Sequence, residues 1–265
     1  MSRSHPDTAI HPTAIVHPEA TLEEGVRIGP YCVVDENVRI GARTRLEAGV
    51  RIWPFTTIGS DCHFFPTSSI GSVPQDLKFQ GEESRLVIGD RNVVREFCTF
   101  NRGTKGGGGT TRIGNDNFFM AYAHVAHDCQ IGDHTVFANA ATLAGHVLVE
   151  DHAVIGAFTG IHQFCRVGKH AFIGGASAIP LDPLPFVRTA GNRARAYGIN
   201  TIGLERKGFS KEAIEKLKDA YRILFHTGRN TAQAIEAVRA DIKGCEEVEY
   251  LVRFIETSER GIVKG

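Results

Sequence analysis

An apolar residue returns at every sixth position through most of the chain before residue 180. The pattern has three uninterrupted runs, which extend from Ile10 to Ile70, from Ile88 to Phe100 and from Ile113 to Ile179. A period of six differs from the 3.6 residues of an α-helix and from the simple alternation of an ordinary strand. It is typical of hexapeptide-repeat proteins, so the sequence predicts an all-β parallel β-helix over this region.

Each repeat of such a solenoid supplies one short strand and one bend, and three repeats close one triangular coil. Residues eighteen positions apart therefore stack in one column along the solenoid. The strands of successive coils pair in parallel, so unpaired edges remain only at the two ends. The repeat thus predicts which distant residues lie side by side.

Two interruptions of the repeat predict loops that leave the coil. Between Ile70 and Ile88 the apolar slots hold Asp76 and Glu82, yet the register is kept, so residues 71–87 should leave the coil and return in phase. The second interruption, an excursion over residues 104–112, adds seven residues and contains four consecutive glycines. A glycine run could suggest a phosphate loop, but no Lys-Ser or Lys-Thr pair follows it. We therefore expect a flexible loop tip of peripheral importance.

The repeat ends at Ile179, and prolines at positions 180, 183 and 185 close it because proline cannot donate to a strand ladder. Helical spacing of apolar residues follows. Helices are expected over residues 211–226 after a Ser210 cap, over 230–242 after an Asn230–Gln233 capping box, and over 246–256. The sequence thus predicts a β-helix over residues 1–186 and a C-terminal helical domain over residues 187–265.

Composition and charge exclude several classes of protein. Lys and Arg total 30, as do Asp and Glu, so no net charge favours nucleic acid or an anionic membrane as a partner. No apolar stretch approaches the ~20 residues of a membrane span, and the N-terminus lacks the apolar run of a secretory signal. We therefore expect a cytoplasmic protein without a membrane span.

Five of the six cysteines occupy one slot of the repeat, four residues after an apolar position. The same slot is elsewhere filled by small residues such as Ala123, Thr135 and Ala141. No Cys-x-x-Cys pair occurs. The cysteines are thus predicted to be small core residues, and neither a disulfide framework nor a set of zinc ligands.

The eighteen-residue stacking collects polar side chains from three consecutive coils at one corner. This cluster, called the polar corner below, comprises His124, His127, Asp128, His146, His162 and Gln163. Core packing requires no polar groups there, and clustered titratable residues favour a functional site. A separate column of turn histidines, His134, His152 and His170, follows the repeat strictly and is expected to be surface structure.

The polar corner has the residues of a general base. A carboxylate beside a histidine fixes the tautomer of the imidazole and favours its protonated form. His127 is the stronger candidate, because Asp128 is its sequence neighbour and would need a bend to point the same way. Backbone amides near Gly145 could stabilise an oxyanion. No Ser or Cys nucleophile is arranged here, which favours direct transfer, and a metal site is the competing use of three histidines.

Several motifs resemble those of the bacterial enzymes that transfer an acyl group from acyl carrier protein to UDP-N-acetylglucosamine in lipid A synthesis. The matching segments lie at residues 75–79, 101–104, 123–129, 143–147, 161–165, 191–192 and 203–210. Many transferases share the repeat, whereas this combination is specific and covers nearly the whole chain. The resemblance implies a left-handed β-helix, a homotrimer with active sites between neighbouring subunits, and no cofactor.

By this resemblance, the protein transfers an (R)-3-hydroxyacyl group to the glucosamine 3-hydroxyl of UDP-N-acetylglucosamine. His127 would be the general base, Asp128 would orient it, and the Gly145 amide would stabilise the tetrahedral oxyanion. The sugar nucleotide and the acyl chain would be held by Asp76, Lys78, His124, His146, His162 and Gln163. The nucleotide diphosphate would be met by Asn200, Arg206 and Lys207.

A few further positions bear on specificity. Gln75 is the common residue of the family, which favours the ordinary acetylamino sugar over its 3-amino analogue. Gly175 matches the position that limits acyl-chain length, so we expect space for a longer chain unless the turn itself requires glycine. Departures from the best-known members leave the ribose contacts open; they are Asn101, Arg193 and Ile202.

Three alternatives remain open from the sequence. The N-acyltransferase of the same pathway usually has an extra N-terminal domain, for which a repeat beginning at Ile10 leaves no room. A γ-class carbonic anhydrase binds zinc through three histidines on the same coil, but the His124-x-x-His127 spacing does not reproduce its ligands. A non-enzymatic scaffold would not need such elaborate excursions.

The acyl carrier protein is acidic, so basic residues of the C-terminal domain are candidates for docking it. They are Arg206, Lys207, Lys211, Lys216, Lys218 and Arg222.

Overall fold

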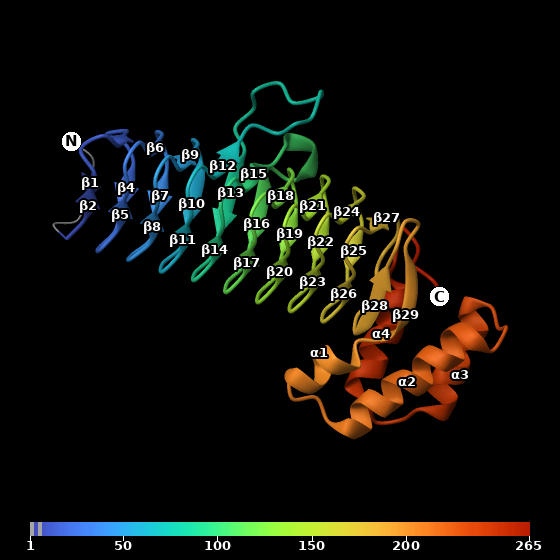
Figure 1. Ribbon diagram of the computed structural model, residues 1–265. Helices are drawn as coiled ribbons and strands as arrows, with labels where there is room; N and C mark the ends of the chain where they lie inside the picture. The colour runs from blue at the N-terminus through green and yellow to red at the C-terminus, as the bar shows by residue number, and fades with distance from the viewer. Residues whose placement is uncertain (1–2, 5–6) are drawn as a thin grey trace.

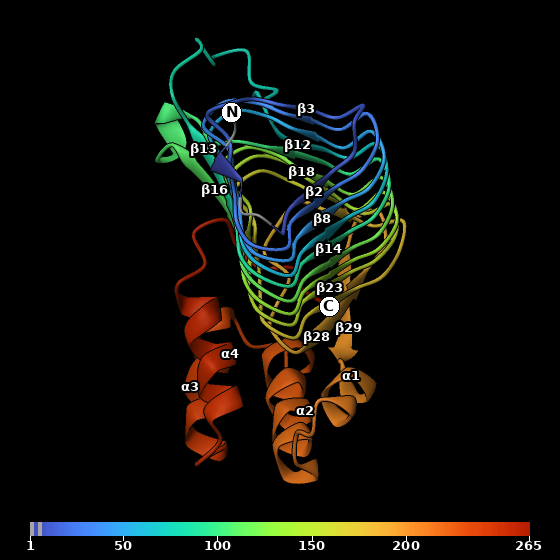
Figure 2. The ribbon, with the colours of Figure 1, turned by 90° about the vertical axis from the view of Figure 1, so that its left-hand side faces the viewer.

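The chain folds into a triangular solenoid followed by a group of helices (Figure 1). The computed structural model describes residues 3–4 and 7–265. Viewed along the solenoid, the coils form a triangle whose three sides are parallel sheets (Figure 2). The predicted parallel β-helix with C-terminal helices is therefore confirmed.

Each side of the triangle is one sheet, to which successive coils contribute successive strands. The first sheet comprises β1 (Arg3–Ser4), β4 (Thr21–Leu22), β7 (Arg39–Ile40), β10 (Thr56–Ile58), β13 (Arg85–Ile88), β16 (Thr110–Ile113), β19 (Gln130–Ile131), β22 (Leu148–Val149) and β25 (Arg166–Val167). The second comprises β2 (Ala9–Ile10), β5 (Arg27–Ile28), β8 (Arg45–Leu46), β11 (His63–Phe64), β14 (Val93–Val94), β17 (Phe118–Phe119), β20 (Val136–Phe137), β23 (Val154–Ile155), β26 (Phe172–Ile173), β28 (Val187–Ala190) and β29 (Arg195–Ile199). The third comprises β3 (Ile15–Val16), β6 (Val33–Val34), β9 (Arg51–Ile52), β12 (Ser69–Ser72), β15 (Thr99–Asn101), β18 (His124–Val125), β21 (Thr142–Leu143), β24 (Gly160–Ile161) and β27 (Ala178–Ile179).

The strand register confirms the stacking rule. Val125 pairs with Leu143, Leu143 with Ile161, and Ile161 with Ile179, each eighteen residues further along the chain. Phe100 pairs with Val125, a separation of 25 that equals eighteen plus the seven inserted residues. Both excursions therefore return to the coil in phase.

The corners of the coils are built from residues with left-handed backbone angles. The fourth residue of a repeat has a positive φ at Asp128 (60°), His146 (61°) and Phe164 (64°). Non-glycine residues seldom adopt this region, so each corner has a conformational cost. Burial of one apolar side chain per repeat offsets that cost. The result is a left-handed parallel β-helix, an exception to the usual right-handed crossover.

The interior of the solenoid is filled by the repeat residues and the cysteines. The rings of Phe100, Phe119 and Phe137 follow one another with centroids 4.8 Å and 4.7 Å apart. All six cysteines are free and buried. Burial raises the pKa of the Cys98 and Cys129 thiols to about 12, which keeps them protonated and unreactive. The prediction that the cysteines are core residues is confirmed.

Both interruptions of the repeat are loops, but they are shorter than the sequence suggested. The first lies between β12, which extends to Ser72, and β13, which begins at Arg85. The second lies between β15 and β16, which begins at Thr110, and contains the 3₁₀ helix η1 (Lys105–Gly107). Both loops project from the same edge of the solenoid (Figures 1 and 2).

Within the described residues, four helices follow the coil: α1 (Thr201–Arg206), α2 (Lys211–His226), α3 (Thr231–Asp241) and α4 (Glu246–Glu256). The last three are the predicted helices. Ser210 caps α2 by accepting a hydrogen bond from the Ala213 amide, and Asn230 and Gln233 form the predicted capping box of α3. The sequence missed α1, which has no side-chain cap.

The stretch after Ile179 is not wholly helical, which corrects the sequence prediction. β28 pairs in parallel with β26 at the end of the second sheet, and β29 pairs antiparallel with β28. The prolines therefore end the six-residue repeat but not the sheet. The hairpin was missed because three arginines and two glycines obscure its strand pattern between Val187 and Ile199.

Side chains of the solenoid fix the helices against its end. Tyr250 of α4 donates a 2.8 Å hydrogen bond to Glu150, and the Lys169 ammonium lies 3.6 Å from the centroid of the Tyr250 ring. The Arg166 guanidinium lies 3.8 Å over the Phe254 ring and also donates to the Phe254 carbonyl. Among the described residues, no helix combines the length and apolarity that crossing a bilayer demands.

The column of turn histidines forms a stack at a corner away from the polar corner. The rings of His134 and His152 lie 4.9 Å apart with planes 2° from parallel, and those of His152 and His170 lie 4.6 Å apart. Burial, with smaller effects of His152 and Lys169, lowers the pKa of His170 to about 4. Burial also lowers the pKa of His152, and the stacked rings at this coil corner fit the structural role that the sequence predicted.

His170 should make stability depend on pH. The folded imidazole stays neutral down to about pH 4, whereas the unfolded chain binds a proton near its ordinary pKa of about 6.5. The unfolded state therefore binds more protons in this window, and the free energy of unfolding falls as the pH drops through it. We expect His170→Phe to show a smaller loss of melting temperature between pH 7 and pH 5 than the parent. The exposed His11→Phe serves as the control, and equal slopes in all three proteins would contradict the prediction.

Candidate active site

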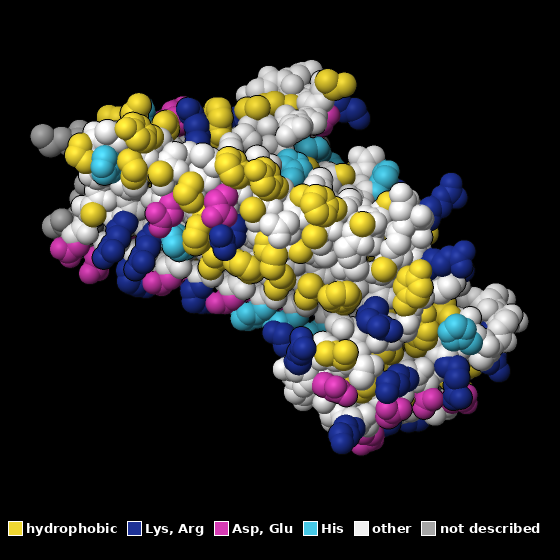
Figure 3. All heavy atoms as spheres, in the orientation of Figure 1, with side chains coloured by type: hydrophobic (Ala, Val, Ile, Leu, Met, Phe, Trp, Pro, Cys, Tyr) yellow, Lys and Arg dark blue, Asp and Glu magenta, His cyan; other side chains and the backbone are white. Residues whose placement is uncertain are grey.

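A cavity of about 1140 Å³ opens at the polar corner, beside the first excursion. Its floor is the third sheet, where Thr142, Gly160 and Ala178 are aligned in successive strands. Figure 3 shows histidines gathered just below the projecting loop. Nine of the predicted site residues line the cavity: Gln75, Asp76, Lys78, His124, His127, Gly145, His146, His162 and Gln163.

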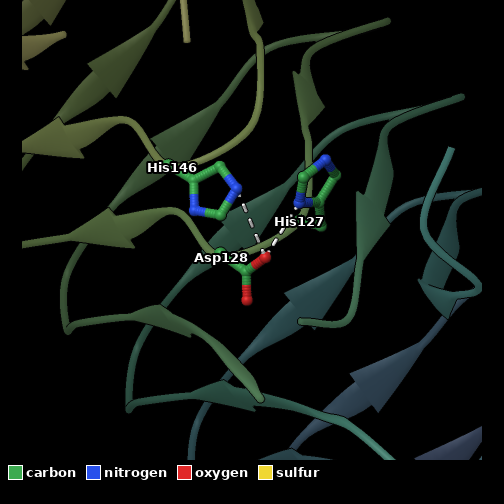
Figure 4. Close-up of side chains that lie close together, drawn as sticks. All are labelled: His127, Asp128 and His146. Atoms are coloured by element: carbon green, nitrogen blue, oxygen red, sulfur yellow. Dashed lines mark hydrogen bonds and ion pairs between the residues drawn. The ribbon is translucent and has the colours of Figure 1, made fainter. Parts of the chain in front are cut away.

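His127 and Asp128 form a hydrogen-bonded pair at the wall of this cavity (Figure 4). Nδ1 of His127 lies 2.8 Å from Oδ2 of Asp128. The positive φ of Asp128 supplies the bend that lets these two sequence neighbours meet. The side chain of Asp128 is 0% exposed and that of His127 14%, so the pair is shielded from water. A histidine held in this way keeps Nδ1 protonated and presents Nε2 as a base.

The second excursion contacts this pair directly, which corrects its prediction as a flexible, peripheral loop tip. Thr104 donates two hydrogen bonds to the Asp128 carboxylate, from its amide at 2.8 Å and from its hydroxyl at 2.6 Å. Gly107 lies so close to this carboxylate that a Cβ there would overlap it. The glycine run thus allows close approach of the backbone, a use of glycine that the sequence alone does not distinguish from flexibility.

His146 lies on the other side of the Asp128 carboxylate. Its Nε2 is 3.8 Å from Oδ2 of Asp128, and its ring is perpendicular to that of His127 at a centroid distance of 5.0 Å (Figure 4). Phe164 stacks on its other face at 4.4 Å. Burial lowers the pKa of His146, more than the Asp128 carboxylate raises it. His146 is therefore a neutral hydrogen-bonding group near neutral pH.

The remaining histidines of the corner are held by neighbours on other segments. Nδ1 of His124 lies 2.7 Å from the Thr99 hydroxyl, and burial lowers the pKa of His124. Arg260 donates a 2.7 Å hydrogen bond to Nδ1 of His162. These contacts fix the two rings, which leaves His127 as the histidine paired most closely with a carboxylate.

Gly145 lies opposite the His127 ring. A Cβ at this position would be 2.5 Å from Cε1 and 2.7 Å from Nε2 of His127. In the described part of the chain, the Gly145 amide has no hydrogen-bond partner. An unpaired amide beside a general base is placed to donate a hydrogen bond to the oxyanion that forms when the activated nucleophile attacks a carbonyl carbon.

The first excursion covers one side of the cavity and carries Gln75, Asp76 and Lys78. The Asp76 carboxylate accepts a 3.0 Å hydrogen bond from the Lys78 amide, which tightens the turn at the tip. At the base of the loop, the buried Asn101 amide donates to the Ser72 hydroxyl at 2.8 Å and to a neighbouring carbonyl. Asn101 thus holds the loop rather than a substrate within this chain.

Five predicted residues do not line the cavity within one chain, and one of them, Asp128, is buried beside His127. Gly175 lies in the turn that precedes β27, where its φ is not left-handed. Asn200 donates to the His170 carbonyl at the start of α1, and Arg206 and Lys207 are exposed at the end of that helix. The structure brings the residues of the polar corner to one cavity, their catalytic roles stay predictions, and the residues predicted to meet the diphosphate lie elsewhere in the single chain.

Several residues of the site were missed from the sequence. Phe164 lines the cavity, Arg260 contacts His162, and Thr104 holds Asp128, while Arg193, whose role the sequence left open, also lines the cavity. Phe164 could have been found by the stacking rule, because it follows His146 by eighteen residues. Arg260 could not, since it lies outside the repeat and reaches the corner only through the fold of the C-terminal segment.

Three side chains of the corner could together hold a metal ion. Ligand atoms of His127, Asp128 and His146 all lie within 4.8 Å of one another. The Oδ2 atom that faces both histidines is already bonded to His127 Nδ1 and to the Thr104 hydroxyl. This bonding favours a base oriented by a carboxylate over a ligand set.

Comparison with known proteins gives consistent matches along the chain. Residues 182–263 match the family described as UDP N-acetylglucosamine O-acyltransferase, domain 2, and residues 110–145 match the six-repeat bacterial transferase hexapeptide family. The acyl-[acyl-carrier-protein]–UDP-N-acetylglucosamine O-acyltransferase of Alkalilimnicola ehrlichii is 55% identical over 257 residues, 97% of this chain and 100% of the relative. The enzyme of the same name from Anaeromyxobacter dehalogenans is 52% identical over 256 residues, with the same coverage.

Solved structures agree with these relatives. A UDP-N-acetylglucosamine acyltransferase from Bacteroides fragilis has a TM-score of 0.94 and 43% identity, over 96% of this chain and 99% of that one. An enzyme from Arabidopsis that carries the same description still reaches a TM-score of 0.77 at 31% identity. The chain therefore belongs to the acyl-[acyl-carrier-protein]–UDP-N-acetylglucosamine O-acyltransferase family.

Proposed function

We propose that this protein transfers an (R)-3-hydroxyacyl group from acyl carrier protein to the 3-hydroxyl of UDP-N-acetylglucosamine, the first step of lipid A synthesis. The observation that carries the proposal is the His127–Asp128 pair beside Gly145, whose amide has no partner among the described residues, at one cavity. This arrangement supplies a base and an oxyanion site within reach of one reacting carbonyl.

The chemistry follows from this geometry. Nε2 of His127 takes the proton of the sugar 3-hydroxyl as its oxygen attacks the thioester carbonyl. The Gly145 amide donates to the oxyanion of the tetrahedral intermediate. Collapse of the intermediate expels the carrier thiolate, which takes the proton back from the His127 imidazolium. Asp128 stays ionised throughout and stabilises that imidazolium.

We propose a homotrimer in which α1 of one subunit completes the cavity of the next. Asn200, Arg206 and Lys207, which the family resemblance assigns to the nucleotide diphosphate, do not line the cavity of their own chain. Large aromatic side chains are also exposed on the coil, with Phe158 at 72% and Tyr122 at 59%. Figure 3 shows apolar side chains spread over the solenoid face. Burial of such a surface against a second copy would be favourable.

The carrier protein should dock on the basic residues that are not already neutralised. Lys216, Lys218 and Arg222 each pair with an acidic residue of α2, at 2.8 Å, 2.7 Å and 3.0 Å. Arg206, Lys207 and Lys211 form no ion pair within the part of the chain that the structure describes. Their free charge suits an acidic partner better.

Gly175 should set the length of the acyl chain. Thr142, Gly160 and Ala178 are aligned on successive strands of the cavity floor, and Gly175 lies in the turn just before the last of these strands. Its φ is not left-handed, so the turn conformation does not require glycine, but a Cβ there would lie 3.2 Å from the Ala157 carbonyl oxygen. We expect Gly175→Met to lower kcat/KM for long hydroxyacyl donors by about 10-fold or more, in the range for a blocked apolar pocket, while shorter donors are affected less. Equal losses for all donor lengths, with an unchanged melting temperature, would contradict this role.

The function itself is tested by incubating the purified protein with UDP-N-acetylglucosamine and a panel of (R)-3-hydroxyacyl carrier proteins. Product that requires both substrates is the expected result. Metal analysis of the same sample addresses the carbonic-anhydrase alternative, for which stoichiometric zinc and no acyl product would be found.

A further inference from the structure

The carboxylate of Asp128 is one of the most enclosed charged groups near the cavity, with a side chain that is 0% exposed. Its Oδ1 accepts the Thr104 amide at 2.8 Å, and its Oδ2 accepts the Thr104 hydroxyl at 2.6 Å as well as His127 Nδ1. Buried carboxylates need such donors, because an unpaired charge away from water is costly. Thr104 alone thus supplies two of the three close donors.

Both ends of the second excursion are fastened to the same residue. Thr104 lies within the excursion and holds the Asp128 side chain, while Thr111, in β16 directly after it, accepts a 2.7 Å hydrogen bond from the Asp128 amide. Thr104 and Thr111 are themselves 5% and 0% exposed. The seven inserted residues therefore form a closed loop around one aspartate.

Two glycines of this segment allow its backbone to pack closely against the Asp128 carboxylate. A Cβ at Gly103 would come within 2.8 Å of Oδ1 of Asp128, and a Cβ at Gly107 would overlap the carboxyl group. Any other residue at these positions would overlap the carboxylate or the backbone of the loop. The backbone at both glycines thus packs directly on the group that Thr104 holds.

The loop is also joined to the excursion that covers the cavity. One carboxylate oxygen of Glu82 accepts the Lys105 amide at 3.2 Å, and the other accepts the Gln80 amide at 2.9 Å. Glu82 thus bridges the two excursions. Movement of the substrate-facing loop is thereby linked to the segment that fixes Asp128.

We propose that Thr104 is a positioning residue for the transfer reaction, which holds the Asp128 carboxylate in the plane that orients His127. The second excursion places this threonine against the carboxylate. The inference rests on the proposed function. Without the hydroxyl, Oδ2 loses a donor and the carboxylate can rotate toward His146, whose Nε2 is already 3.8 Å away.

Thr104→Val tests the proposal because it removes the hydroxyl and keeps the shape. We expect kcat to fall about 10- to 100-fold, the range for a hydrogen bond to a charged group, with KM for UDP-N-acetylglucosamine changed by less than about threefold. Thr104→Ser restores the donor and should recover most of kcat. In an Asp128→Asn background, Thr104→Val should cause little further loss, because the residue acts through Asp128.

A matched control exists in the coil outside the cavity. Thr135 donates through its amide at 2.7 Å and its hydroxyl at 2.6 Å to the buried Asn117 side chain, the same pattern without a catalytic partner. Thr135→Val should lower the melting temperature as much as Thr104→Val does, yet keep kcat. A kcat within twofold of the parent in Thr104→Val, or equal losses in the parent and Asp128→Asn backgrounds, would overturn the proposal. If Asp128→Asn itself retained full activity, the assigned role of Asp128 in the proposed function would fail as well.

Discussion

Replacing His127 by alanine is expected to lower kcat by a factor of about 10²–10⁴, the usual effect of losing a general base. His127 is paired with a fully buried carboxylate at 2.8 Å and borders the cavity beside the Gly145 amide. The neighbouring histidines cannot replace it easily, because His124 is bound to Thr99 and His146 is stacked on Phe164. Steady-state kinetics with the carrier-protein donor measures the effect.

The same experiment separates catalysis from binding. Loss of a base alone should leave KM for UDP-N-acetylglucosamine within a few-fold of the parent, because the base acts in the transition state. His17→Ala, on an N-terminal coil far along the solenoid, serves as the control for the loss of a histidine. A His127→Ala enzyme that keeps at least a third of the parental kcat would remove His127 as the base.

Gly145→Ala should have the second largest effect, a loss in kcat of about 10²–10³-fold. The added Cβ would lie 2.5 Å from Cε1 of His127, so the imidazole must move away from the cavity and from the amide that faces the oxyanion. The variant should still fold, since the residue is in a turn between strands and its φ is not left-handed. Steady-state kinetics and thermal melting together distinguish a loss of catalysis from a loss of folding.

Gly160→Ala provides the comparison for Gly145→Ala. Gly160 belongs to the floor of the same cavity, one coil further along, and nothing lies within 4 Å of a Cβ placed there. Its alanine variant adds the same volume without touching His127, and should lose much less kcat. Similar losses in both variants would mean that bulk in the cavity, and not displacement of the base, explains the Gly145 result.

The solenoid was predictable because its period is a whole number. Six residues per side and eighteen per coil place each residue in a column by arithmetic alone, so the pairing of Val125 with Leu143, and of Leu143 with Ile161, followed from their numbers. The same arithmetic brought His127, His146 and His162 to one cavity. Helices α2 and α3 were predictable for a different reason, since their caps are local in sequence.

The details of the site depend on features that no local pattern reveals. Whether His127 and Asp128 can meet is decided by the left-handed φ of the corner, and the repeat does not disclose it. Thr104 was missed because the sequence of a glycine run does not tell whether the glycines make the loop flexible or let its backbone approach another group closely. The contact of Arg260 with His162 joins residues 98 positions apart across two units of the fold.

The alternatives raised by the sequence differ in the bond that they predict. The O-acyltransferase forms an ester at the sugar 3-position and leaves the acetamido group intact. The related N-acyltransferase would form an amide, and a carbonic anhydrase would form neither. Because the acetamido nitrogen of UDP-N-acetylglucosamine is already acylated, only the O-acyltransferase can acylate this acceptor, so formation of the ester distinguishes it from the other two.

The most direct test is NMR of the product from UDP-N-acetylglucosamine and an (R)-3-hydroxyacyl carrier protein. The account predicts one new ester, seen as a downfield shift of the sugar H3, with the acetamido methyl signal retained. It also predicts that this product disappears with His127→Ala. Acylation at another position of the sugar nucleotide, or no product from the folded protein, would contradict the account.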